Sequence, residues 1–290
     1  MRFDLWLPTA NPFATPDYLR SVCETAEEVE VHRIWVGEHV VLFDEYGSSY
    51  PYAADGRLPV GGSTGLLEPF VTLSFLAAHT SSVRLGTAMC LVPQRNPVYT
   101  AKEVATLDWL SGGRIDLGVG VGWLREEFEA LGVPWPRRGQ RTDQCLDVMR
   151  TLWEDEVSSY EGELISLPPC RQFPKPVQRP VPIHIGGESD AAIGRVARIA
   201  NGWVPFNRRP EELASLVEKL EGALAKEGRR REDVEITVCP YFNQTAPEDI
   251  AAYAKAGADC FATFFLALDA GQVPDAFDAV RPMLEATRAV

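Results

Sequence analysis

Short apolar runs alternate with longer helical patterns along the whole chain. The apolar runs lie at residues 3–7, 33–39, 83–89, 114–122, 181–187, 202–206, 234–241 and 258–268. Between them, apolar residues recur at helical spacing, and Thr15-Pro16 and Asn96-Pro97 combine a cap residue with a first-turn proline. Eight strand–helix units predict an α/β fold, a (β/α)8 TIM barrel, as one domain over residues 1–290.

Two long segments interrupt the alternation, and we expect them to be insertions after strands 2 and 4 of the barrel. The first, at 43–66, is rich in Gly, Pro and Tyr, and the second covers 156–181. In the second, "YEGELISL" predicts one arm of a hairpin, and the proline-rich "PPCRQFPKPVQRPVP" excludes both a helix and a central strand. A doubly wound sheet would need G-x-G-x-x-G after the first strand, where "PTANPFATP" has no glycine.

Composition restricts the partners that we expect. A net charge of -13 disfavours phosphate backbones and anionic lipid, so we expect a small-molecule substrate rather than nucleic acid or a membrane. The six cysteines form no C-x-x-C pair and the four histidines show no zinc spacing, which predicts reduced thiols, a cytoplasmic protein and no metal site.

The predicted ends of four consecutive strands carry the candidate site, because catalytic groups of such barrels lie at the carboxyl ends of the strands. These ends are Gly37-Glu38-His39, Thr87-Ala88-Met89, Gly120-Val121-Gly122 and Gly186-Gly187-Glu188-Ser189. Glycine lets backbone N–H groups approach a ligand, and the fifth strand end opens a helix, which favours an anion such as phosphate. Alternatively, Ser189 or Asp190 is only an N-cap and the glycines form only a tight turn.

Several motifs together resemble the luciferase-like oxidoreductase superfamily, over about residues 1–205. They are "WVGEH", "RLGTAMCLVPQRNPVYTAKEVATLDWLSGGRIDLGVGVGWLREEFEALGVPW", "RRGQRTDQCLDVMRTLW", "PIHIGGES" and "ANGW". The resemblance implies a cofactor phosphate at the Gly120–Gly122 and Gly186–Ser189 turns, with the Glu188 carboxylate pointing away. It also implies that Thr87, Ala88 and Met89 support the cofactor ring, often with a non-prolyl cis peptide, which by position falls at Ala88–Met89.

The same resemblance makes His39 the candidate catalytic residue, with Glu38 as its partner. An imidazole can donate or accept a proton near neutral pH; the alternatives are a lining histidine and a solvated carboxylate. Trp123 stands where deazaflavin sugar-phosphate dehydrogenases carry an acid, which indicates a more apolar wall. We expect Glu126-Glu127 to be the solvated face of a helix, and Trp203 to Phe206 to be pocket wall or core.

Three functions follow from the resemblance. The first is hydride transfer between the deazaflavin F420 and an organic substrate, with Arg95, Arg208 and Arg209 as candidates for contacting its acidic tail. The second is an FMN-dependent monooxygenase that uses O2 and a reduced flavin supplied by a separate reductase. The third is a flavin-binding protein without turnover. The resemblance also implies a homodimer, whereas the substrate is not indicated.

Overall fold

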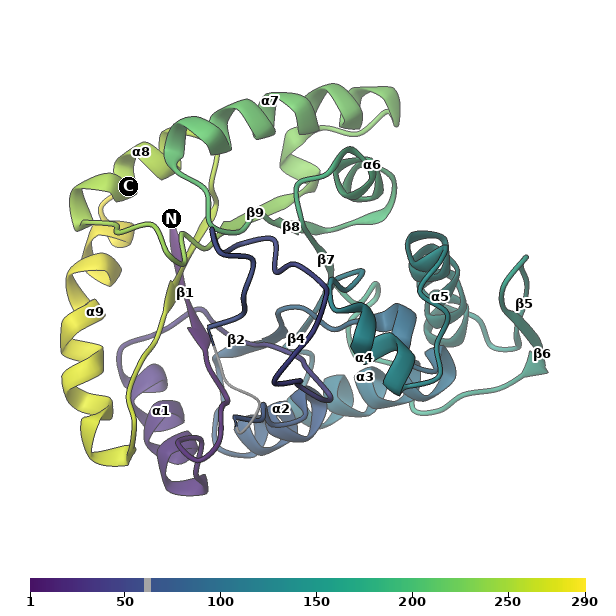
Figure 1. Ribbon diagram of the computed structural model, residues 1–290, viewed down its shortest axis with the longest axis horizontal. Helices are drawn as coiled ribbons and strands as arrows, with labels where there is room; N and C mark the ends of the chain where they lie inside the picture. Colours follow the sequence, from purple (N-terminus) through teal and green to yellow (C-terminus); the bar gives the residue numbers. More distant parts are fainter. Residues whose placement is uncertain (60–63) are drawn as a thin grey trace.

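The computed structural model describes residues 1–59 and 64–290. Its central feature is a closed barrel of parallel strands in the order β1-β10-β9-β8-β7-β4-β3-β2, which confirms the (β/α)8 prediction (Figure 1). The barrel strands are β1 (Arg2–Leu7), β2 (Arg33–Val36), β3 (Arg84–Thr87), β4 (Ile115–Val119), β7 (Ile183–Gly186), β8 (Gly202–Val204), β9 (Glu235–Val238) and β10 (Cys260–Phe264).

Helices surround the barrel and follow the predicted spacing. They are α1 (Pro16–Glu28), α2 (Pro69–Ala78), α3 (Pro97–Ser111), α4 (Arg125–Ala130), α5 (Arg138–Glu154), α6 (Asp190–Ile199), α7 (Pro210–Lys226), α8 (Ile250–Lys255) and α9 (Val273–Arg288). The predicted caps form: Thr15 accepts from the N–H of Tyr18, and Asn96 accepts from the first turn of α3. Short 3-10 helices lie at Val92–Gln94, Arg231–Asp233, Pro247–Asp249 and Ala270–Gln272.

The two insertions lie where we expected them, after β2 and β4, and residues 60–63 of the first lie outside the described part. The second insertion holds a hairpin of β5 (Ser158–Glu161) and β6 (Ser166–Cys170). Our expectation of one arm in "YEGELISL" was incomplete, because the second arm includes Pro168 and Pro169. Prolines are tolerated there because β6 pairs on one side only. Beyond it, Gln178 is anchored by two hydrogen bonds to the buried Asp108.

Buried ion pairs fill the barrel near the amino ends of its strands. The Arg33 guanidinium pairs with Asp4 at 3.3 Å, Asp116 at 2.7 Å and Glu235 at 2.8 Å. Burial by itself would raise the pKa of Asp116, but Arg33 and the hydrogen bonds of His184 and Arg84 hold it well below its usual range. Each buried charge in this network has an opposite partner, and removing one partner would leave an uncompensated buried charge, which is strongly destabilising.

We call the opening at the carboxyl ends of the strands the mouth of the barrel. A second, mainly apolar cluster lies directly beneath it and forms its floor. Trp35, Ala88, Phe206, Cys239 and Ala262 are buried in it, and Trp6, Tyr52, Met89 and Tyr241 pack against it. The Trp35 indole N–H donates to Asp4 at 2.9 Å, which joins this floor to the ionic network. Gly86 is required beside it, because a Cβ there would lie 2.3 Å from the Trp35 ring.

Candidate active site

The ends of β4 and β7 lie side by side, as the phosphate-site hypothesis requires. Leu117, Gly118 and Val119 pair in parallel with Ile183, His184 and Ile185. Each strand is followed by a glycine with positive φ: 79° at Gly122 and 95° at Gly187. Other residues rarely adopt this left-handed conformation, so the sequence uses glycine to make both turns.

These two turns present backbone donors to the mouth. Within residues 1–59 and 64–290, the N–H groups of Val121, Gly122, Gly187 and Ser189 have no hydrogen-bond acceptor. Gly187 and Ser189 precede α6, whose helix dipole adds partial positive charge. The arrangement is chemically suited to an anion.

Two of the predicted contact glycines have a different role. The N–H of Gly120 donates to the Cys90 carbonyl at 2.9 Å, so it is not free for a ligand. A Cβ at Gly120 would lie 3.0 Å from Met89 Cβ, and one at Gly186 would lie 2.8 Å from Met89 Cγ. Gly120 and Gly186 are therefore explained by the Met89 side chain that packs across β4 and β7, rather than by close approach of a ligand.

Ser189 and Glu188 both use their side chains within the protein. The Ser189 hydroxyl accepts from the N–H of Ala192 at 3.2 Å, so it is the N-cap of α6 and keeps its hydrogen for a ligand. The Glu188 carboxylate accepts from the N–H of Phe206 at 2.7 Å and from Arg208 at 3.3 Å. Burial raises the pKa of Glu188, and these two donors oppose the rise. The carboxylate is thus directed to the end of β8.

Arg138, at the start of α5, adds a cation that the sequence analysis missed. Its Nε donates to the Gly122 carbonyl at 3.3 Å, and its guanidinium stacks 3.7 Å from the centre of the Trp135 ring. This places a positive charge against the β4 turn. The only sequence signal was an arginine pair at a helix start, which has no defined position relative to the turn until the chain folds.

The end of β3 carries a non-prolyl cis peptide between Ala88 and Met89, at the position that the resemblance implied. The N–H of Ala88 donates to the Val36 carbonyl at 2.6 Å, and the Thr87 hydroxyl donates to the Gly118 carbonyl at 2.7 Å. These bonds connect the peptide to the strands on either side. Thr87 and Ala88 are almost fully buried, so they position this strand end from below.

His39 is held by Glu127, and our prediction that Glu127 belongs to a solvated helix face was wrong. Glu127 is 0% exposed, because α4 lies beneath the chain that follows β2. Its carboxylate accepts from His39 Nδ1 at 3.1 Å and from the N–H of Val40 at 2.6 Å. A carboxylate can only accept, so this contact assigns the proton to Nδ1 and leaves Nε2 available. Glu126 instead binds the Ser48 hydroxyl at 2.7 Å.

Glu38 does not pair with His39, which corrects the second catalytic assignment. Its buried carboxylate accepts from the N–H of Leu91 and from Arg95, each at 2.6 Å. Arg95 also pairs with Glu68 and Glu103, so it is not free to contact a cofactor tail. Glu38 and Arg95 instead fix the segment after β3.

Aromatic side chains line much of the mouth. The Trp123 ring lies edge-on to His39 at 5.6 Å and to Tyr50 at 5.1 Å, which forms the apolar wall that we expected at this position. Phe206 contacts the rings of Trp6 and Tyr52, each at 4.8 Å. The sixth barrel strand ends at Val204, so Phe206 follows it. Trp203 is fully buried and therefore belongs to the core.

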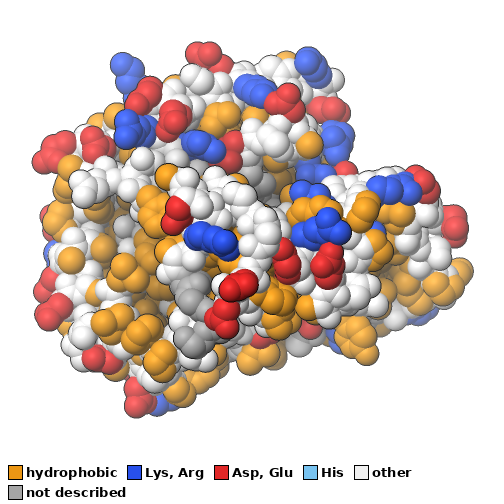
Figure 2. All heavy atoms as spheres, in the orientation of Figure 1, with side chains coloured by type: hydrophobic (Ala, Val, Ile, Leu, Met, Phe, Trp, Pro, Cys, Tyr) orange, Lys and Arg blue, Asp and Glu red, His pale blue; other side chains and the backbone are white. Residues whose placement is uncertain are grey.

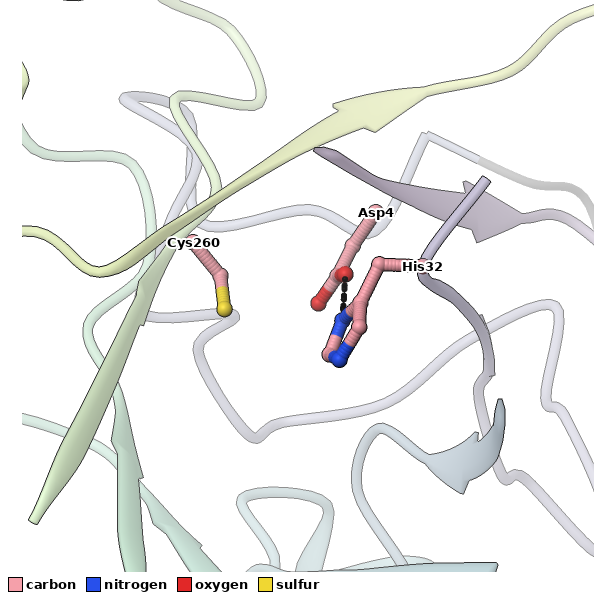
Figure 3. Close-up of side chains that lie close together, drawn as sticks. All are labelled: Asp4, His32 and Cys260. Carbon is pink, nitrogen blue, oxygen red and sulfur yellow. Dashed lines mark hydrogen bonds and ion pairs between the residues drawn. The ribbon is translucent and has the colours of Figure 1, made fainter. Parts of the chain in front are cut away.

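At the opposite end of the barrel, Asp4, His32 and Cys260 offer ligand atoms within 4.8 Å of one another (Figure 3). His32 Nδ1 lies 2.8 Å from one Asp4 oxygen. The other Asp4 oxygen accepts from Arg33 and Trp35. Burial raises the pKa of the Cys260 thiol well above its usual range. Both Asp4 oxygens are engaged by protein groups, so the trio forms part of the ionic network.

In the described part of the chain, no helix is both long enough and apolar enough to cross a membrane.

The whole chain matches a known family. The model of the luciferase-like monooxygenase family covers residues 1–288. The chain is 32% identical to the uncharacterized protein Rv0953c of Mycobacterium tuberculosis, over 89% of each sequence. It is 33% identical to the pyrimidine monooxygenase RutA of Stutzerimonas stutzeri, covering 84% of this chain and 71% of that one. It is also 33% identical to an F420-dependent glucose-6-phosphate dehydrogenase of Microbacterium testaceum, and the match covers 67% of this chain and 60% of that protein.

Solved structures share the fold. Monooxygenase RslO1 from Streptomyces bottropensis superposes with a TM-score of 0.76 at 21% identity, covering 100% of this chain and 99% of the other. The F420-dependent tetrahydromethanopterin reductase of Methanopyrus kandleri gives a TM-score of 0.74 at 16% identity, covering 95% and 96%. Since the family model spans nearly every residue, the chain belongs to the luciferase-like monooxygenase family.

Proposed function

We propose that this protein is an oxidoreductase that transfers hydride between the deazaflavin F420 and an organic substrate. The observation that carries the proposal is the His39–Glu127 pair at the end of β2. Many deazaflavin-dependent members of the superfamily have a histidine at this strand end. Here the fully buried Glu127 carboxylate binds Nδ1 of His39, which leaves Nε2 available for the reaction.

The residues at the mouth fit such a cofactor. Its phosphate would bind the free N–H groups of the β4 and β7 turns and the Arg138 guanidinium. Its ring system would lie over the Ala88–Met89 peptide and the aromatic floor. When bound, F420 supplies a carbon that donates or accepts hydride.

The chain's own residues would then do three things. His39 would hold or move a proton at Nε2, with Glu127 balancing the charge on the imidazole. Trp123 and the neighbouring rings would exclude water from the reacting atoms. Glu38, through Leu91 and Arg95, would hold the segment after β3 in place.

The alternative is an FMN-dependent monooxygenase. The similarity to RutA supports it, because RutA is a pyrimidine monooxygenase. The same turns would hold the phosphate of FMN, and a separate reductase would supply the reduced flavin. A flavin-binding protein without turnover is the weaker option, because it gives no reason for a buried partner of His39.

Direct titration separates these proposals. F420 and FMN, each oxidised and reduced, are titrated into the purified protein, and the dissociation constant is measured by the change in cofactor fluorescence or absorbance. We expect F420 to bind at least tenfold more tightly than FMN. Tight FMN binding with rapid oxygen consumption and no affinity for F420 would reverse the order of the two proposals.

A further inference from the structure

The mouth of the barrel is divided into two arcs of different chemistry. One arc, over β3, β4 and β7, holds the cis peptide, the glycine turns and Arg138. The other arc follows β9, β10, β1 and β2, which are consecutive neighbours in the barrel. We call the segments 8–14, 40–43, 240–246 and 265–268 the apolar arc.

The apolar arc contains no Asp, Glu, Lys or Arg, although 24% of the chain is charged. It nevertheless exposes large hydrophobic side chains: Leu266 is 65% exposed, Leu268 54%, Val40 51%, Phe242 48% and Phe13 40%. Figure 2 shows hydrophobic side chains gathered over the segment that links β10 to α9. Exposed hydrophobic side chains gain free energy when a ligand covers them, which makes this part of the mouth a candidate binding surface.

Ring contacts connect the apolar arc to the candidate active site. The ring centres of Phe242 and Tyr241 are 3.9 Å apart, and those of Tyr241 and Phe206 are 4.5 Å apart. Phe206 belongs to the floor of the mouth. On the other side, Val40 follows His39 directly and donates to Glu127. An occupant of the arc would therefore lie against the floor and beside His39.

Three carboxylates at the mouth are engaged within the protein: Glu188 binds Arg208, Glu38 binds Arg95, and Glu127 binds His39. The segments of the apolar arc carry no charge of their own, so a charged ligand that lay on them would lose its hydration without gaining an opposite charge there, which is costly. An uncharged, apolar ligand would instead gain free energy by covering the exposed hydrophobic side chains.

We propose that the apolar arc binds the organic substrate, and that this substrate is an uncharged, predominantly apolar molecule. This rests on the proposed function, because it assigns the substrate side of the same reaction. The continuity of the arc with the floor of the mouth favours a small molecule that reaches His39 over a macromolecule that would rest on the rim.

Matched alkyl probes test the chemical class. n-Hexanol, n-octanol, octanoate and octylammonium are titrated calorimetrically into the protein, first alone and then loaded with F420 or FMN. We expect octanol to bind about 15-fold more tightly than hexanol, since each buried methylene contributes about 0.8 kcal/mol, or about fourfold. We also expect octanol to bind at least tenfold more tightly than octanoate or octylammonium. Equal affinity for the neutral and charged probes would overturn the proposal.

Variants locate the probe. Leu266→Asp and Phe242→Asp should each weaken octanol binding at least tenfold and leave cofactor affinity unchanged, because both side chains are exposed. Leu266→Met should retain binding, and so should the control Val157→Asp, which lies beside the β5–β6 hairpin. Unchanged octanol binding in Leu266→Asp and Phe242→Asp, or no octanol binding at all, overturns the inference whatever the cofactor does. Selective octanol binding by a protein that binds neither cofactor would support the arc and refute the proposed function.

Discussion

His39 Nδ1 lies 3.1 Å from Oε2 of Glu127, and the two residues are 88 positions apart in the chain. The carboxylate is 0% exposed and also accepts from the backbone directly after His39. Because one buried group binds both the imidazole and its backbone, it sets the orientation and the tautomer of the ring together.

This pair leads to a prediction about catalysis. Glu127→Gln should lower kcat about 10–100-fold and His39→Ala about 100-fold or more, because proton transfer by a positioned group typically contributes 10²–10⁴-fold. Cofactor affinity should stay within twofold.

The matched control is Glu126→Gln, the adjacent carboxylate that binds Ser48 and does not contact His39. It should retain the wild-type kcat. A Glu127→Gln enzyme with wild-type kcat would leave His39 as a lining residue.

The glycine turns give a prediction about cofactor binding. A Cβ at Gly187 would lie 3.7 Å from the Cβ of Ala192, which is an ordinary contact distance. The φ of 95° at Gly187 is nevertheless strained for any other residue, so Gly187→Ala should displace the N–H groups before α6. We expect about tenfold weaker cofactor binding by titration. Arg138→Ala should weaken binding by a similar factor and reduce its dependence on salt, because a charge contact is lost.

Arg141→Ala serves as the control, because Arg141 lies on the same helix and bonds to the Pro134 carbonyl. If Arg138→Ala binds cofactor as well as Arg141→Ala does, the phosphate site is wrongly placed.

Glu27 gives a prediction about stability and pH. Its carboxylate accepts from the N–H groups of Ser81, Ser82 and Val83 and from both serine hydroxyls. Burial raises the pKa of Glu27, but the hydrogen bonds from these N–H groups outweigh it and lower the pKa from 4.5 to about 2. A lowered folded-state pKa contributes stability that is fully present above about pH 4.5 and is lost as the pH falls towards 2.

Glu27→Gln should therefore lower the free energy of unfolding by about 1–2 kcal/mol at pH 7, since hydrogen bonds to a charged group are replaced by weaker ones at a partly exposed site. The difference from wild type should shrink as the pH falls from 4.5 to 2, as measured by urea unfolding. A difference that is independent of pH would contradict the linkage.

The homodimer that the resemblance implies remains a prediction, and α2 and α3 offer a surface for it. Val71 is 71% exposed, Tyr99 73%, Trp109 58% and Leu110 70%. A second copy also carries a net charge of -13, so it would approach most easily over helices whose outward side chains are mostly uncharged. Light scattering should show a dimer for the wild type and a monomer for Leu110→Asp combined with Tyr99→Asp. A monomeric wild type at micromolar concentration would exclude this interface.

Local chemistry determined what could be predicted from the sequence. The period of the apolar runs gave the barrel, because a strand buried between helices and core must be apolar along its length. Thr15 and Asn96 start helices because their side chains satisfy N–H groups two or three residues away. Gly122 and Gly187 mark turns because the backbone there needs positive φ. Each of these effects acts over a few residues, so the sequence shows it directly.

Contacts between distant segments were decided only by the tertiary structure. Glu127 resembles a solvated helix residue until the chain after β2 folds over α4 and buries it. Glu38 lies next to His39 in sequence, but it turns away to Leu91 and Arg95. Gly120 and Gly186 make room for Met89, on another strand. The physical reason is that the role of a carboxylate or a glycine depends on the groups that pack against it. These groups come from distant parts of the chain and meet only when the barrel closes.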